Sequence, residues 1–159
     1  MPDAFLTPGD GTRCHQVLDV FGDQVRIKVR SADTSGSFAL ITSHTPPNGG
    51  PPLHTHISDD EAFYVLSGTF VFELDDQQVH AVAGDTVFIP AGVKHLYQNT
   101  GAETGELLLV VMPGGLDDFF VELDALLRLP GAPDMGAIAQ LHATYKMELL
   151  GPPLAARGA

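Results

Sequence analysis

Four residues of this sequence have the types and spacing of a metal-ligand set: His54, His56, Glu61 and His95. Residues i and i+2 of a β-strand point to the same face, so the imidazoles of His54 and His56 can reach a common point. Residues 57–60 are mostly polar and turn-like, and the bend that they predict returns Glu61 toward that point. His95 begins a later short run of strand-forming residues. The four side chains are therefore candidates for one site built from separate segments.

The donor atoms indicate the chemistry of such a site. Three imidazole nitrogens and one carboxylate oxygen suit one divalent transition metal (Fe, Mn, Ni, Co, Cu or Zn), and the donors do not select among these ions. On an octahedral ion, four protein ligands leave two positions for water, substrate or dioxygen.

The elements that must position these residues are short strands. The chain contains 17 glycines and 12 prolines, and short runs of β-forming residues lie between them. Many short strands separated by turn signals predict an all-β sandwich or barrel. Asp75-Asp76 predicts a tight hairpin between two of the strands. Besides the strand that carries His54 and His56, the predicted strands are 25–29, 37–42, 62–66, 69–74, 78–82, 86–89, 95–98 and 106–112.

The pattern becomes helical after residue 115. Apolar residues at spacings of three and four predict a helix from Leu116 to Leu127, with Asp117 and Asp118 favoured in its first turn by the helix dipole and Pro130-Gly131 ending it. A second helix is predicted from Asp134, as its N-cap, to about Met147. These roughly 35 residues are too few to fold alone, so we expect them to pack on the barrel, over its outside or its mouth.

Length and composition limit the class of protein. The 159 residues predict one domain, divided into a β-barrel with N-terminal strands (1–115), a helical extension (116–150) and a flexible tail (151–159). With 8 Lys+Arg against 20 Asp+Glu, the net charge of −12 argues against nucleic-acid and anionic-membrane partners. The first residues lack the pattern of a signal peptide, so we expect a cytoplasmic location. The single cysteine, Cys14, excludes an intramolecular disulfide framework, and nothing marks it as a nucleophile.

The candidate ligands lie within two longer motifs. The first, HTH-(x4)-E-(x6)-G, contains His54, His56, Glu61 and Gly68, and the second, G-(x5)-P-x-G-(x2)-H-(x3)-N, contains Gly84, Pro90, Gly92, His95 and Asn99. Together they resemble the two motifs of the cupin superfamily. At roughly one in twenty per position, chance agreement at all of these positions is negligible. One departure is Asn48, which stands where the first motif often opens with a glycine.

The resemblance implies a fold and a site. The fold is a double-stranded β-barrel, a jelly roll of two facing antiparallel sheets, with a metal in its mouth bound by His54, His56, Glu61 and His95. Gly68 and Gly84 would then take positive φ at hairpin turns, and Asn99 would cap a turn with its side chain. Small cupins commonly form homodimers, so we expect a dimer. The residues expected to line the substrate pocket are Phe63, Val65, Tyr97 and Met112.

A looser resemblance points to an activity. The segments GGPPLHTH, EAFYVLSGTF and PGG-(x2)-DFF are similar to those of single-domain cupins of the quercetin-dioxygenase-like type. By this resemblance, the protein would open a flavonol or another enol substrate with dioxygen. Glu61 would take the hydroxyl proton as the catalytic base, in an apolar pocket that suits an aromatic ring.

Two alternatives remain open, because one fold hosts many chemistries. The same metal site would serve an isomerase or lyase of a small oxygenated acid, although few cationic residues are placed to hold a carboxylate. It would equally serve a non-catalytic protein that binds a small molecule. Outside the two motifs, His15, His44, His80 and His142 are interpreted as structural or exposed, with His44 the first to examine as a partner of the ligands.

Overall fold

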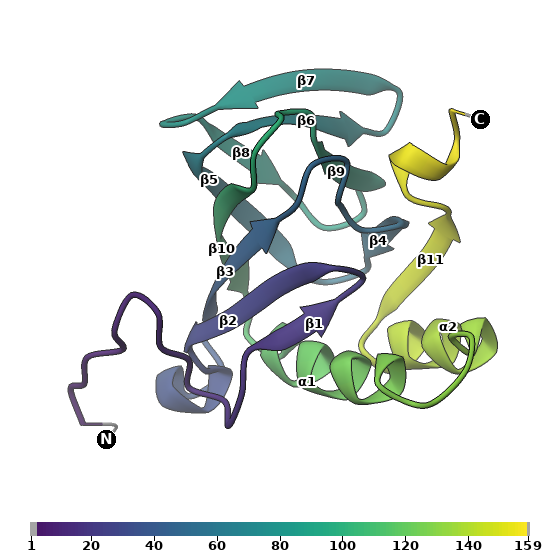
Figure 1. The fold of residues 1–159 in the computed structure, drawn as a ribbon. Coiled ribbons are helices and arrows are strands. Elements are labelled where there is room, and N and C mark those ends of the chain that lie inside the picture. Colours follow the sequence, from purple (N-terminus) through teal and green to yellow (C-terminus); the bar gives the residue numbers. More distant parts are fainter. Residues whose placement is uncertain (1–2, 159) are drawn as a thin grey trace.

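Two antiparallel sheets face each other in the computed structural model, which describes residues 3–158 (Figure 1). The first sheet has the order β1 (Leu18–Val20), β2 (Asp23–Val29), β3 (Ala39–Thr45), β10 (Gly105–Met112), β5 (Asp60–Ser67) and β8 (Thr86–Ile89). The second has the order β11 (Met147–Gly151), β4 (Leu53–His56), β9 (His95–Asn99), β6 (Thr69–Leu74) and β7 (Gln77–Val82). Helices α1 (Leu116–Leu127) and α2 (Met135–Thr144) and the short 3-10 helices η1 (Ser31–Thr34) and η2 (Leu154–Ala156) complete the described chain.

The core lies between the two sheets, because inward-facing apolar residues alternate along the strands. In β10, for example, Leu107, Leu109 and Val111 are buried, while Leu108 and Val110 between them are half-buried. Strands occur in every segment where they are predicted, although Ser37 and Phe38 precede β3. The predicted pair of facing antiparallel sheets is therefore confirmed. Across residues 3–158, the strand pairings form two separate sheets, which makes the fold a β-sandwich.

The turns follow their predicted chemistry. Asp75 and Asp76 form the loop between β6 and β7, and Asp75 has a left-handed φ of 51°. Gly68 and Gly84 have φ of 91° and 96°, a region that residues with a side chain avoid. Asn99 caps its turn as expected, because its Nδ2 donates to the carbonyls of Thr45 and Glu103 and its Oδ1 accepts from the amide of Gly101.

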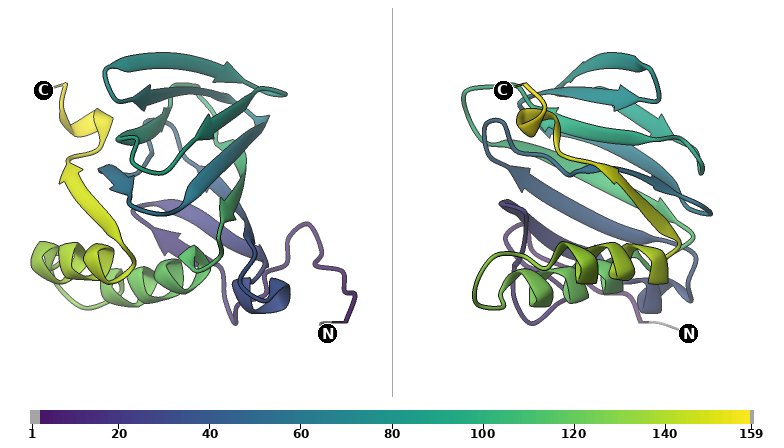
Figure 2. Two further views of the ribbon diagram at one scale, coloured as in Figure 1. Left: turned by 180° about the vertical axis from the view of Figure 1, so that it is seen from behind. Right: turned by 90° about the vertical axis from the view of Figure 1, so that its right-hand side faces the viewer.

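The two helices lie side by side below the open side of the sandwich, with α1 against β1 (Figures 1 and 2). Helix α1 has the predicted bounds, and Leu116, Phe119 and Leu123 form its buried face. Asp134 caps α2 as predicted by accepting from the amide of Ala137. Among the described residues, no helix combines the length and apolar character needed to cross a membrane.

The predicted extension of α2 to Met147 is wrong. The helix ends at Thr144, Lys146 takes a left-handed φ of 56°, and Met147 begins strand β11. This strand pairs with β4, where Met147 lies opposite His56 and Leu149 opposite His54. The C-terminal segment therefore completes the second sheet beside the strand that carries two candidate ligands.

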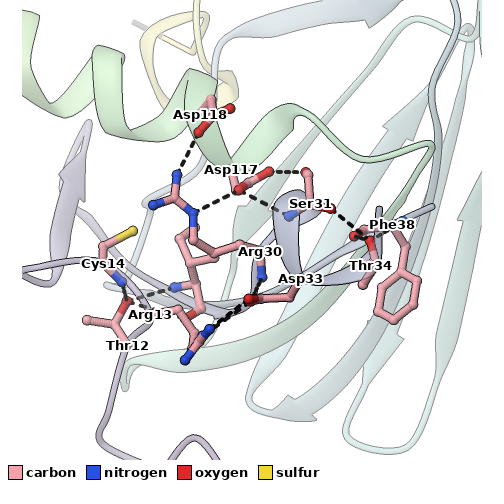
Figure 3. Close-up of polar contacts among 11 residues, drawn as sticks. Thr12, Arg13, Cys14, Arg30, Ser31, Asp33, Thr34, Phe38, Asp117 and Asp118 are labelled. Atoms are coloured by element: carbon pink, nitrogen blue, oxygen red, sulfur yellow. Dashed lines mark hydrogen bonds and ion pairs between the residues drawn. The ribbon is translucent and has the colours of Figure 1, made fainter. Parts of the chain in front are cut away.

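Polar contacts hold the start of α1 against η1 (Figure 3). The buried carboxylate of Asp117 accepts two hydrogen bonds from Ser31, one from its hydroxyl and one from its backbone amide at 3.2 Å. It accepts a third from Nε of Arg30 at 3.3 Å. Arg30 also donates through Nη2 to the exposed Asp118 at 2.6 Å. The helix dipole accounts for only part of the role of these acids, because Asp117 is mainly a tertiary anchor.

We expect Asp117→Asn to lower the free energy of unfolding by about 2 kcal/mol, because it weakens the acceptor of three buried or half-buried donors. Chemical denaturation of the purified protein measures the change. Asp118→Asn is the matched control, and the loss of its single exposed ion pair should change stability by less than about 0.5 kcal/mol. Equal effects of the two substitutions would contradict the anchoring role of Asp117.

Candidate metal centre

Both sheets contribute to the centre. His54 and His56 lie on β4 and His95 on the neighbouring β9, while Glu61 comes from β5 of the opposite sheet. His54 is paired directly with His95 across the β4–β9 ladder. One donor atom from each of the four side chains lies within 4.8 Å of every other. The structure thus brings together all four residues that the sequence predicts.

Each imidazole is oriented through its Nδ1 atom. Nδ1 of His54 lies 2.8 Å from the carbonyl of Pro52, and that of His95 lies 2.9 Å from the carbonyl of Val93. A carbonyl only accepts, so both Nδ1 atoms carry the proton and both Nε2 lone pairs are free. Nδ1 of His56 faces a carboxylate instead, at 3.4 Å from Oδ2 of Asp59. These contacts direct the three Nε2 atoms toward one centre.

The donors fit a bound cation. Nε2 of His56, Nε2 of His95 and Oε2 of Glu61 are buried and have no hydrogen-bond partner. Oε2 lies 2.7 Å from Nε2 of His95 and 3.5 Å from Nε2 of His56, without the geometry of a hydrogen bond. Buried polar atoms are rarely left without a partner. A divalent ion would satisfy all three at once, and the residues can therefore hold one.

The charges of the cluster favour the metal-binding forms of His54 and Glu61, whereas His56 would release a proton on binding a metal. Burial, followed by the nearby His95 and His56, lowers the pKa of His54 to about 3, so this ring is neutral at pH 7. Burial opposes ionisation of Glu61, but His56, His95 and His54 together outweigh it and lower the pKa of this carboxyl. Burial likewise opposes protonation of His56, but Glu61 and Asp59 outweigh it and raise its pKa. Glu61 is therefore an anionic ligand at neutral pH.

The loop before β4 explains the departure from the expected motif. Asn48 takes a left-handed φ of 63°, a conformation that glycine adopts freely and asparagine tolerates better than most residues. Its amide donates to the carbonyl of Asn99, and the amide of Asn99 donates to the carbonyl of Gly49. Asn48 therefore performs the backbone role of the absent glycine and attaches the loop to the end of β9.

A mostly apolar cavity of about 70 Å³ adjoins the four ligands between the sheets. Phe63 and Tyr97 line it, in agreement with their expected place. Val65 is fully buried in the core and Met112 is 37% exposed, and neither is among the lining residues. Helix α1 closes one side of the cavity through Leu116, Phe119, Phe120 and Leu123.

Three residues near the site were not identified as partners from the sequence. Asp59 contacts His56, and its place three residues later in the bend was an available signal. His142, interpreted as structural or exposed, is buried on α2 and lines the cavity. Asp23 also lines the cavity, and no local pattern marks it.

His44 is not a partner of the ligands, because its ring contacts Arg26 and Glu106 instead.

Comparison with known proteins supports the family. Residues 42–111 match the cupin domain family. A solved structure described as an RmlC-like cupin from Shewanella frigidimarina superposes with a TM-score of 0.60 at 19% identity, covering 73% of this chain and 96% of that one. At this identity, the similarity concerns the fold alone.

Two curated relatives differ in what their names describe. The chain is 30% identical over 116 residues to quercetin 2,3-dioxygenase from Bacillus subtilis, which covers 72% of this chain and 33% of that protein. It is 36% identical over 67 residues to an oxalate-binding protein from Thermotoga maritima, which covers 42% of this chain and 55% of that protein. The matches thus span about a third to a half of the curated relatives' lengths.

We expect His95→Ala to abolish tight binding of a divalent transition metal, because it removes one of four converging donors. Isothermal titration calorimetry of the metal-free protein with Zn²⁺ or Co²⁺ measures the affinity. His80→Ala is the matched control, since His80 is exposed on β7 and lies outside the cluster. Unchanged affinity in the His95 variant would show that the four residues are not one binding site.

A second substitution tests the orientation of His56. Asp59→Asn should weaken metal affinity by roughly 10–100-fold, the usual effect of losing the partner of a ligating imidazole. The same titration measures it, and Asp60→Asn is a neighbouring control, because the Asp60 carboxylate accepts from the amide of Ala91 rather than from a ligand. Equal affinities of the Asp59 variant and the native protein would exclude this role.

Proposed function

Residues 42–111 match the cupin domain family, and from that similarity we propose that this protein is a metal-dependent dioxygenase of an enolic small molecule. The observation that carries the proposal is the set of buried, unpartnered donors beside an apolar cavity. Similarity to a quercetin 2,3-dioxygenase over 72% of the chain supports the reaction class. The related prediction that the protein is a homodimer stays a prediction.

His54, His56, Glu61 and His95 would hold the metal. A divalent ion at this place supplies Lewis acidity, which makes an enolic hydroxyl a stronger acid. Glu61 would also take the hydroxyl proton, because its ionised carboxylate lies among the residues that would hold the metal. The enolate supplies the electrons that reduce dioxygen. Both oxygen atoms then enter the organic products, and no separate reductant is needed.

The size of the cavity favours a compact substrate. Its volume of about 70 Å³ is far below the ~300–1,000 Å³ of sites that enclose drug-sized ligands. A single-ring enol is therefore a better candidate than a three-ring flavonol, which would require the α1 side chains to move. The apolar lining would exclude water from a bound enol and so favour its transfer of a proton to Glu61 over exchange with solvent.

Binding without turnover is the second candidate, and similarity to the oxalate-binding protein favours it. An isomerase or lyase of a small acid is less well supported. Such a reaction needs cationic side chains for the substrate carboxylate, yet among residues 3–158 no lysine or arginine lines the cavity.

Oxygen uptake tests the proposal. Protein loaded in turn with each of the six metals named above is supplied with 3-hydroxy-2-methyl-4-pyranone or with quercetin, and dioxygen is followed with an electrode. We expect one dioxygen consumed per pyranone with at least one metal, and slower uptake with quercetin. Glu61→Gln should lower the rate by roughly 10²–10⁴-fold, the usual contribution of a general base, with metal content measured in parallel. Tight pyranone binding without uptake would favour the binding protein instead.

A further inference from the structure

A second polar group faces the cavity, contributed by strands distant from the metal ligands in sequence. Asp23, at the start of β2, is 4% exposed and lines the same cavity as the four ligands. One of its oxygens, Oδ2, accepts three hydroxyl hydrogen bonds: from Ser43 at 3.0 Å, from Thr45 at 2.9 Å and from Tyr97 at 2.7 Å. Tyr97 belongs to the opposite sheet, so these bonds join the two sheets across the core.

The other oxygen of this carboxylate is unpartnered. Oδ1 of Asp23 is buried and accepts no hydrogen bond. A buried carboxylate oxygen without a donor is unfavourable by several times the free energy of an ordinary hydrogen bond. Tyr97 does not relieve it, because its hydroxyl is already donated to Oδ2. Burial raises the pKa of this carboxyl, and among the described residues that line the cavity there is no lysine or arginine to oppose that effect.

We propose that Asp23 accepts a hydrogen bond from the substrate and so selects enols that carry a second hydroxyl group. The proposal rests on the proposed function, because it places the substrate between the metal ligands and Asp23. The enol oxygen of the substrate would then lie at the metal centre, and its second hydroxyl would donate a hydrogen bond to Oδ1 of Asp23. Between the metal ligands and Asp23, apolar side chains such as Phe63 and Leu109 line the cavity and suit the faces of an unsaturated ring.

The unpartnered oxygen separates this role from a purely structural one. A carboxylate needed only to join the sheets would be satisfied by its three hydroxyl donors, all of which reach Oδ2. A selective group must also leave an acceptor for the ligand, and Oδ1 is such an acceptor. A substrate that lacks the second donor would leave Oδ1 buried and unpaired, which is the strongest basis for discrimination between similar molecules.

Two pyranones that differ by one hydroxyl test the proposal. In 5-hydroxy-2-hydroxymethyl-4-pyranone the second hydroxyl lies across the ring from the chelating enol, and 5-hydroxy-2-methyl-4-pyranone lacks it. Calorimetry measures the binding of each to the Zn²⁺-loaded protein without dioxygen. Zn²⁺ has no redox chemistry, so the measurement is independent of turnover. The native protein should bind the hydroxymethyl compound roughly tenfold more tightly, as expected where the other compound leaves a buried acceptor unpaired.

Asp23→Asn is the matching substitution, because it keeps the size of the side chain and replaces one acceptor oxygen by an amide donor. It should reduce the preference to less than about twofold while leaving Zn²⁺ affinity unchanged. Thermal unfolding shows whether the variant is folded, and the preference of the native protein remains a test if it is not.

Equal binding of the two pyranones by the native protein would overturn the proposal. The same holds if the Asn variant unfolds at a lower temperature but keeps the native preference, since Asp23 would then only join the sheets. Selective binding without oxygen uptake would support Asp23 as a selecting group and would refute the dioxygenase alone.

Discussion

The structure depends on holding together, away from water, four donor groups that could bind a metal. The lone pairs of three imidazoles and a carboxylate do not attract one another, so the fold must hold each side chain in its orientation. It does so through the opposite side of each ring, where the carbonyls of Pro52 and Val93 and the carboxylate of Asp59 set the orientation. Glu61 reaches the same place only because the first sheet faces the second. The site is therefore a product of the sandwich and not of any one strand.

The C-terminal segment is part of this arrangement. Helix α1 closes the cavity through its apolar face, and β11 pairs with the strand that carries His54 and His56. Asp117 fixes the first turn of α1 to the segment after β2. An open edge on β4 would leave the backbone of the ligand strand unpaired and easier to distort. We infer that residues 116–151 fold together with the sheets and that a boundary at residue 115 marks a change of secondary structure rather than of folding unit.

Local patterns in the sequence predicted most of the fold and the four candidate ligands that the structure brings together. The alternation of strands such as β10, the spacing of His54 and His56 and the apolar face of α1 each lie within one short segment, so their physical cause can be read there. Strand β11 could not be predicted in this way. Its residues Met147, Glu148 and Leu149 are good helix formers. They adopt a strand conformation because they pair with β4, and this long-range contact cannot be read from the local sequence. Asp23 was missed for the same reason, because its partners lie on β3 and β9.

Asp23 and the metal centre limit the ligand more than the family does. Cupin folds serve many reactions, so the fold alone selects no substrate. Within this cavity, a ligand meets four metal-binding donors, a buried carboxylate with a free acceptor, and otherwise mostly apolar side chains. Its small volume disfavours large ring systems, and the absence of lysine and arginine from its lining among residues 3–158 disfavours free carboxylates. A compact ring with an enol at one side and a hydroxyl at the other satisfies each of these constraints at once, and neither a flavonol nor a simple dicarboxylate does so.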